Sequence, residues 1–224
     1  MSQESDERRR RAKELATEFL SRGDATGWFE AFYQEARGDL SKIPWADKAV
    51  NPLLIEWLDR TGIRGDGRRA LVIGSGLGDD AEELARRGFH VNAFDISDEA
   101  IRLCRLRFAG SPVNYQTADL FHLPADWRGD FDFVLESLTL QALPPELRRR
   151  AVEAVANTVA RGGLLLVLAR ACDEDETRPG VPWPLRRSEL RWFNDSGLAE
   201  ESVEDFMDAE VPPVRRFRVA YRRP

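Results

Sequence analysis

The chain has 224 residues, 42% of them hydrophobic and 32% charged, and this composition predicts one folded domain over residues 1–224 and excludes wholesale disorder. The net charge of −6 argues against a large nucleic-acid surface, and no apolar run is long enough for a membrane helix, so we expect neither nucleic-acid nor membrane partners. The N-terminus lacks the apolar segment of a signal peptide, and we therefore expect a cytoplasmic protein. Two cysteines and two histidines, without zinc spacing, exclude a disulfide framework and predict no metal site.

The N-terminal part of the chain reads as helical. Amphipathic patterns predict helices around residues 7–21, 26–37 and 51–61. We expect residues 1–62 to form a helical cover over a core that comprises residues 63–224.

From Ala70 onward, strand and helix patterns alternate, which predicts a parallel α/β sheet. Ser97 is a plausible N-cap, and we expect the pair Gly162-Gly163 to end the long helix before the fifth strand. Arginines alternate with apolar residues in the last strand, as on a half-exposed sheet edge. The predicted strands are 70–73, 90–95, 112–119, 131–137, 164–170, 201–209 and 213–222, the last two paired as a hairpin, and the predicted helices are 79–88, 97–108, 144–160 and 187–196.

The segment LVIGSGLGDD links the first strand to the first helix of the core. Such a glycine loop predicts a nucleotide site at the carboxyl ends of the strands. No lysine is close enough for a P-loop, and Asp79 stands where a dinucleotide site needs its third glycine, which disfavours a nicotinamide oxidoreductase. The spacing GxGxG of Gly74, Gly76 and Gly78 is typical of S-adenosyl-L-methionine (SAM) sites instead.

Acidic residues close three successive strands. Asp95 is placed to accept hydrogen bonds from ribose hydroxyls, and Asp119 from the adenine amino group while Leu120 packs on the ring. Glu136 faces the same crevice. Because the carboxyl ends of parallel strands meet at one edge, the three acids predict convergence on one ligand.

The chain resembles class I SAM-dependent methyltransferases, within them the thiopurine S-methyltransferase-like and tellurite-resistance-type group. The resemblance covers residues 28–222 and rests on WFEAFYQEARGDLSKIPWA, GSGLGDDAEELARRGFHVNAFDIS, YQTADLFHLP, ESLTLQALPPELR and PGVPWPLRRSEL. It implies a Rossmann-like, mostly parallel sheet of seven strands in the order 3-2-1-4-5-7-6, with helices on both faces and the N-terminal helices closing over SAM.

The resemblance also implies roles for single residues. Trp45 is expected beside the cofactor, the pair Glu136-Ser137 near its methionine end, and Trp183 beside the acceptor. The expected cofactor-binding residues are Trp45, Gly74, Ser75, Gly76, Gly78, Asp95, Ile96, Ala118, Asp119, Leu120, Glu136 and Ser137. The expected substrate-binding residues are Trp28, Phe29, Tyr33 and Trp183, although Phe29, Phe32 and Tyr33 have the spacing of a helix core as well.

Two positions depart from the family pattern. Val72 stands where many methyltransferases have an acid, so Asp79, Asp80 or water must meet the ammonium of SAM. Val181 replaces a proline in the acceptor loop, which predicts a looser loop.

The predicted function is methyl transfer to a small-molecule nucleophile, with a thiol, halide or other soft acceptor favoured. Direct displacement requires alignment more than a catalytic dyad, so no catalytic residue is assigned; Glu136, Asp119 and His122 are the candidates for a general base. Two alternatives stay open: a SAM-binding sensor or accessory protein without turnover, and a protein methyltransferase. The acidic charge and the absence of a DPPY-type sequence disfavour a nucleic-acid methyltransferase.

Overall fold

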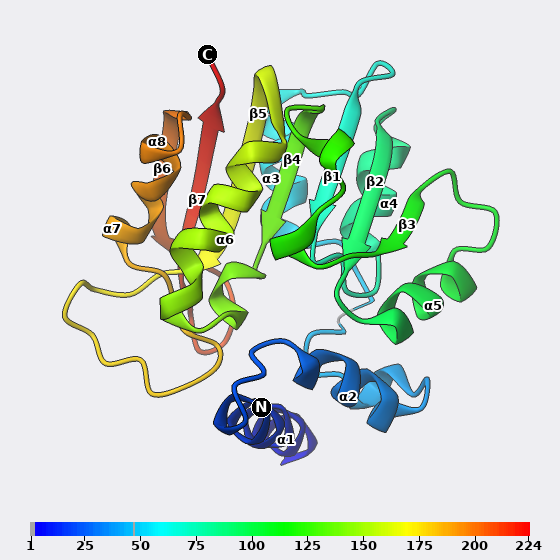
Figure 1. The fold of residues 1–224 in the computed structure, drawn as a ribbon, viewed down its shortest axis with the longest axis vertical. Helices are drawn as coiled ribbons and strands as arrows, with labels where there is room; N and C mark the ends of the chain where they lie inside the picture. The colour runs from blue at the N-terminus through cyan, green and yellow to red at the C-terminus, as the bar shows by residue number, and fades with distance from the viewer. Residues whose placement is uncertain (1–2, 47) are drawn as a thin grey trace.

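The protein is built around one twisted sheet of seven strands. The computed structural model describes residues 3–46 and 48–224, and its strands lie in the order β3-β2-β1-β4-β5-β7-β6 (Figure 1). All neighbours pair in parallel except β7, which is antiparallel to β5 and to β6. This confirms the predicted strand order. The strands are β1 (Arg69–Ile73), β2 (His90–Asp95), β3 (Asn114–Thr117), β4 (Phe131–Ser137), β5 (Val159–Arg170), β6 (Ala199–Met207) and β7 (Arg215–Arg222).

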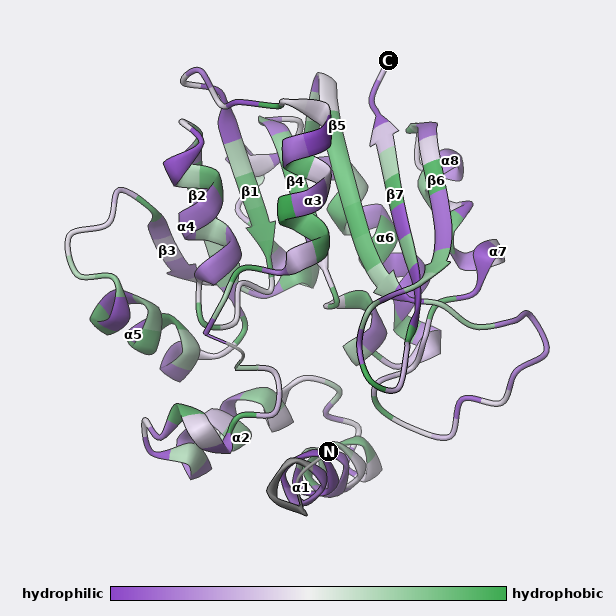
Figure 2. Ribbon diagram, turned by 180° about the vertical axis from the view of Figure 1, so that it is seen from behind, coloured by the Kyte–Doolittle hydropathy of each residue, from purple (hydrophilic) through white to green (hydrophobic). Residues whose placement is uncertain are grey.

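Helices cover both faces of the sheet. Figure 2 shows α3 and α4 in front of the strands, with α6 behind them. The α-helices are α1 (Gln3–Ser21), α2 (Gly27–Ala36), α3 (Pro52–Thr61), α4 (Asp79–Arg86), α5 (Asp98–Arg107), α6 (Pro145–Thr158), α7 (Arg187–Leu190) and α8 (Trp192–Asp195). Short 3-10 turns are η1 (Leu40–Lys42), η2 (Leu120–His122), η3 (Ala125–Trp127) and η4 (Leu140–Ala142). No helix in the described part of the chain has the length and apolar character needed to cross a membrane.

Strand β5 shows why its sequence is continuously apolar. Leu165 and Val167 belong to the apolar cluster beneath α6 and α8, whereas Leu164 and Leu166 belong to the cluster beneath α3, α4 and α5. Successive side chains of a strand point to opposite faces, so a strand covered on both faces needs an apolar residue at every position.

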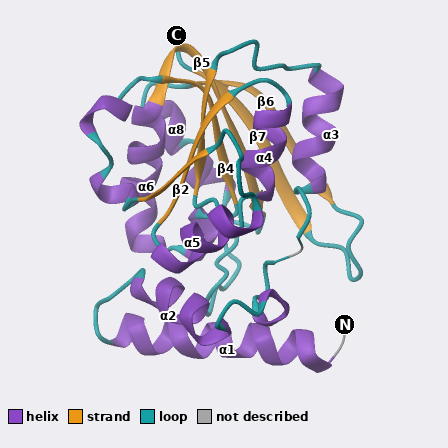
Figure 3. Ribbon diagram, turned by 90° about the vertical axis from the view of Figure 1, so that its right-hand side faces the viewer, coloured by secondary structure: helices purple, strands orange, loops and turns teal. Residues whose placement is uncertain are grey.

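The cover over the carboxyl ends of the strands is made by α1 and α2 (Figures 1 and 3). They join the rest of the protein through a third apolar cluster, in which Phe32 packs with Leu77 and Leu103. Helix α3 packs on the sheet itself, with the Trp57 ring 6.1 Å from that of Phe133. The N-terminal 62 residues are therefore divided between a cover and a sheet layer.

Two predictions of helix extent are wrong. Helix α6 ends at Thr158, so the pair Gly162-Gly163 does not end it but lies inside β5. A Cβ at Gly163 would come within 2.8 Å of the Phe131 carbonyl oxygen. The helix predicted over 187–196 is two short helices, α7 and α8.

The last strand is interior and not at the sheet edge. The side chain of Arg218 is only 3% exposed, and its guanidinium donates to Glu204 at 2.7 Å and Glu56 at 3.0 Å. Glu204 lies on β6, which occupies the edge. Arg216 and Arg218 of β7 are therefore buried as ion pairs, whereas the Arg222 side chain is 43% exposed and pairs with Glu201. Sequence alternation alone could not distinguish this arrangement from a solvent-exposed face.

Candidate cofactor and acceptor site

The glycine loop follows β1 at the carboxyl edge of the sheet. Gly74, Gly76 and Gly78 all have positive φ, at 59°, 54° and 89°. A Cβ at Gly78 would lie 2.5 Å from the Tyr115 hydroxyl, and one at Gly74 would collide with Thr139. Both the backbone conformation and its close neighbours therefore require glycine at these positions.

Asp95 is buried at the end of β2 and faces this loop. Its carboxylate accepts hydrogen bonds from the backbone N–H groups of Gly76 at 2.9 Å and Ser97 at 3.0 Å. Burial raises the pKa of Asp95 to about 6, although these two hydrogen bonds favour the ionised form. Each carboxylate oxygen has lone pairs left, so the group can also accept from a diol such as ribose.

The two acids that begin α4 differ in what they are free to bind. Asp79 forms a two-point ion pair with Arg107, at 2.7 and 2.8 Å. Asp80 instead accepts from the backbone N–H of Asn51 at 2.8 Å, and the Asn51 amide donates to the Ser137 hydroxyl at 3.1 Å. Burial raises the pKa of Asp80 to about 6. Of the two acids considered for the ammonium of SAM, the geometry favours Asp80.

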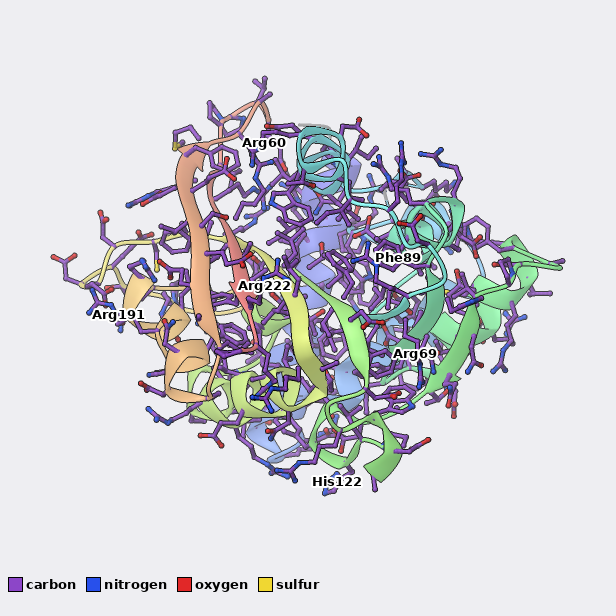
Figure 4. The ribbon with its side chains drawn as sticks, turned by 90° about the horizontal axis from the view of Figure 1, so that it is seen from above. Arg60, Arg69, Phe89, His122, Arg191 and Arg222 are labelled. Carbon is purple, nitrogen blue, oxygen red and sulfur yellow. The ribbon has the colours of Figure 1, made fainter. Side chains whose placement is uncertain are left out.

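Asp119 lies two residues beyond the end of β3 and begins the turn η2. Its carboxylate accepts from the Phe121 N–H at 2.8 Å and contacts the His122 ring nitrogen Nδ1 at 2.6 Å. The His122 side chain is 75% exposed and lies at the periphery of the molecule (Figure 4). His122 is therefore not directed into the site as a base.

The cover contributes a group of aromatic rings. The Trp45 indole N–H donates to the Tyr33 hydroxyl at 2.8 Å, and the Trp45 ring lies 5.0 Å from Phe32 and 6.1 Å from Trp28. Trp28 and Tyr33 are almost fully buried, whereas Trp45 is 37% exposed. Trp28 and Tyr33 therefore belong to the packed core and also line the site.

These features line one cavity of about 1630 Å³. The cavity is bounded by the strand ends, the cover and the segment between β6 and β7. The expected site residues that line it are Trp28, Phe29, Tyr33, Trp45, Gly74, Ser75, Gly76, Gly78, Asp95, Ile96, Ala118, Asp119, Leu120 and Ser137.

Glu136 and Trp183 lie outside this lining. Glu136 is completely buried, and its Oε1 accepts from the N–H groups of Thr139 and Leu140, both at 2.8 Å. Its Oε2 has no partner among the described residues, and burial raises its pKa to about 7. Trp183 packs into the apolar cluster of the cover, and its backbone N–H donates to the Gln141 carbonyl at 2.7 Å.

Asn51 and Arg170 also line the cavity, although neither is among the residues that the sequence predicts at the site. The N-cap signal before Pro52 identifies Asn51 as a helix start but not its contacts with Asp80 and Ser137, which are distant in sequence. Arg170 ends β5, so the same strand-end argument that selected the acids applies to it.

The chemistry of the loop suits SAM. Arg107 donates to the Leu77 carbonyl of the loop and is neutralised by Asp79, so among the described residues this arginine is not available for a phosphate. The Ser75 hydroxyl is buried and has no hydrogen-bond partner among the described residues, so a polar group is available at the centre of the loop. A positively charged, phosphate-free ligand fits this donor and acceptor set.

A sheet of this order, with a glycine loop after the first strand and an acid at the end of the second, defines a Rossmann-like methyltransferase fold. The profile of the thiopurine S-methyltransferase (TPMT) family matches residues 27–220. The chain therefore belongs to the thiopurine S-methyltransferase family. The predicted class, a SAM-dependent methyltransferase, and the predicted cofactor are confirmed.

Single relatives show the same class. A ubiquinone biosynthesis O-methyltransferase from Aromatoleum aromaticum is 35% identical over 117 residues, which are 51% of this chain and 48% of the relative. The chain thus matches about half the length of such curated relatives.

Solved structures share the fold. The Burkholderia thailandensis 1,6-didemethyltoxoflavin-N1-methyltransferase, solved with bound 1,6-didemethyltoxoflavin and S-adenosylhomocysteine, aligns with a TM-score of 0.66 and 17% identity over 87% of this chain and 85% of that one. TehB from Haemophilus influenzae aligns with a TM-score of 0.62 and 16% identity over 81% of this chain and 65% of that one.

Proposed function

We propose that the chain transfers the methyl group of SAM to a small-molecule nucleophile by direct in-line displacement, and that a thiol, halide or other soft acceptor is favoured. The observation that carries this proposal is the single cavity onto which both the glycine loop and the aromatic cover open. A displacement reaction needs the two reactants held in line and water kept out, and proximity alone supplies ~7–11 kcal/mol.

The chain's own residues have distinct parts in this proposal. Asp95 holds the ribose, Asp119 and Leu120 border the adenine, and Asp80 with Ser137 meets the methionine end. SAM supplies, when bound, an electrophilic methyl group on a sulfonium. Trp45 presents an aromatic face to that cation, a contact that contributes ~0.5–2 kcal/mol.

The preference for a soft acceptor follows from the groups at the cavity. No histidine lies in its described lining, and Glu136 is buried outside it. A thiol with a pKa of about 8.5 is already a few per cent thiolate at neutral pH and needs no dedicated base. A phenol, with a pKa near ~10, is ionised far less. The family's name supports sulfur as the acceptor atom.

Calorimetric titration with SAM, S-adenosylhomocysteine and NAD tests the cofactor part. We expect binding of the first two ligands and none of NAD; binding of NAD alone would overturn the proposal. Product detection by mass spectrometry then compares thiophenol and iodide with phenol and a lysine-containing peptide. We expect methylation of thiophenol or iodide first. Cofactor binding without methylation of any acceptor would identify a sensor, and methylation of the peptide alone a protein methyltransferase.

A further inference from the structure

One wall of the cavity is rich in arginine. Arg170, Arg216 and Arg218 all line it, from the ends of β5 and β7. Arg216 is neutralised by Asp208 at 2.6 Å and by Glu210 at 2.5 Å. Arg218 has its two carboxylates on α3 and β6, as described above. Two of these three cations are therefore compensated within the protein.

Arg170 has no bonded carboxylate among the described residues. Its guanidinium makes no hydrogen bond or ion pair with any residue that the structure describes, although the residue is half-buried. Its backbone is nevertheless fixed, because its N–H donates to the Gln141 Oε1 at 2.8 Å and its carbonyl accepts from the Leu185 N–H at 2.8 Å. The position of this residue is thus held, while its charged group is left to the cavity.

The surroundings make that charge unfavourable without a ligand. Arg170 lies directly opposite Arg216 in the antiparallel register of β5 and β7, so the two side chains leave the sheet on the same face. Because Arg216 already has two carboxylates of its own, burial rather than this neighbour is the larger effect on Arg170. Burial, and next the charge of Arg216, lower the pKa of Arg170 below its ordinary value. The nearby Asp208 and Glu210 act against this, but both carboxylates are bonded to Arg216.

The cover adds positive charge to the same cavity. Arg9 and Lys13 of α1 are part of its lining. On the sheet side, Ser137 pairs with Leu168 in the register of β4 and β5, so Arg170 lies one strand away from Ser137 and two residues further along. An anion bound at Arg170 would therefore lie close to the proposed methionine site.

We propose that Arg170 anchors the methyl acceptor and that the acceptor carries a carboxylate. The planar guanidinium fork matches a carboxylate through two parallel hydrogen bonds. This inference rests on the proposed function, since it names the chemical class of the acceptor at that site. The nucleophilic atom and the carboxylate belong to the same small molecule.

The test uses benzoate and its neutral isostere benzamide as probes, titrated calorimetrically against the full chain with and without S-adenosylhomocysteine. We expect benzoate to bind at least ~10-fold more tightly than benzamide, and Arg170→Met to remove this preference. Arg170→Lys, which keeps the charge but not the fork, should retain part of it. Arg102→Met is the matched control, because Arg102 is exposed on α5 and paired with Glu99 away from the cavity.

Equal binding of benzoate and benzamide to the unmodified chain would overturn the inference, whether or not the variants fold. So would a preference that persists in folded Arg170→Met. If the unmodified chain prefers benzoate but does not bind S-adenosylhomocysteine, the proposed function is overturned and the anion site is retained. As a second readout, methylation of 4-mercaptobenzoate should exceed that of 4-mercaptobenzamide in the unmodified chain and in Arg102→Met, and this difference should disappear in Arg170→Met.

Discussion

At the scale of single residues, Asp95 connects the fold to the ligand. The same carboxylate that we assign to the ribose also holds the glycine loop through Gly76 and the start of α5 through Ser97. Its charge is retained at neutral pH against the effect of burial. A residue with both tasks affects affinity and loop order together, so its variants must be compared at the level of binding in a folded protein.

We predict that Asp95→Asn weakens binding of S-adenosylhomocysteine by ~1.5–3 kcal/mol for each ribose hydrogen bond lost. Binding to the unmodified chain should also weaken as the pH falls through about 6, because the protonated carboxyl has one acceptor fewer. Calorimetry between pH 5 and 8 measures both effects. Asp98→Asn, on the neighbouring α5 and outside the cavity, should bind normally. Unchanged affinity in folded Asp95→Asn contradicts the assignment.

At the scale of elements, the loop over residues 172–186, which the resemblance places beside the acceptor, is fastened by a buried ion triad. Glu189 of α7 accepts from Arg148 of α6 at 2.8 Å and from Arg178 of the loop at 2.6 Å. Arg148 also donates to the carbonyls of Trp183 and Pro184. Val181 is buried in the apolar cluster of the cover, so the loop is packed at this position where its sequence predicted loosening.

We predict that Glu189→Gln lowers the free energy of unfolding by ~3–5 kcal/mol, because two buried guanidinium groups lose their counter-charge. Hydrogen exchange over residues 172–186 should accelerate in parallel. Glu200→Gln is the control, since its ion pair with Arg187 is partly exposed and contributes ~1 kcal/mol or less. Urea denaturation measures both variants; a difference below ~1 kcal/mol between them would show that the triad does not fasten the loop.

The sequence predicts the ranges of helices and strands better than the contacts that these elements make with distant parts of the chain. The ranges 90–95 and 131–137 coincide with β2 and β4, because apolar strands bounded by turns are a local signal. Ser97 caps α5 as expected and accepts from the Ala100 N–H at 3.0 Å. The burial of β7 and the role of Asn51 depend on residues distant in the chain, and no local pattern contains them. No local pattern shows either that the guanidinium of Arg170 lacks a hydrogen-bond partner among the described residues.

At the scale of the whole molecule, three carboxyl groups with raised pKa oppose folding at neutral pH: Asp80 at the start of α4, and Asp95 and Glu136 at strand ends. Burial raises the pKa of Asp80 and Asp95 to about 6 and that of Glu136 to about 7. The folded chain therefore binds protons between the unfolded pKa, near ~4, and these higher values. Proton uptake by the folded state stabilises it as the pH falls.

We predict that the free energy of unfolding of the ligand-free protein rises as the pH is lowered from 8 to 5, by a few kcal/mol at most, at ~1.4 kcal/mol per unit of pKa difference. Acids with a lowered pKa, such as Glu204 at about 2, withdraw stability only below ~4.5. Guanidinium denaturation across this range checks the direction. Glu136→Gln should flatten the rise between pH 8 and 6, and a steady fall from pH 8 to 5 would be inconsistent with buried neutral acids.

The position of β7 between β5 and β6 has a consequence for synthesis on the ribosome. Strand β6 emerges before β7 but has β7 as its neighbour in the sheet, and β5 keeps a bare edge until residues 215–222 have left the exit tunnel. The nascent chain therefore carries an unpaired apolar strand edge until a late stage of translation, and such edges recruit other strands. A ribosome stalled shortly before Arg215 therefore presents an edge of β5 that β7 covers in the complete fold.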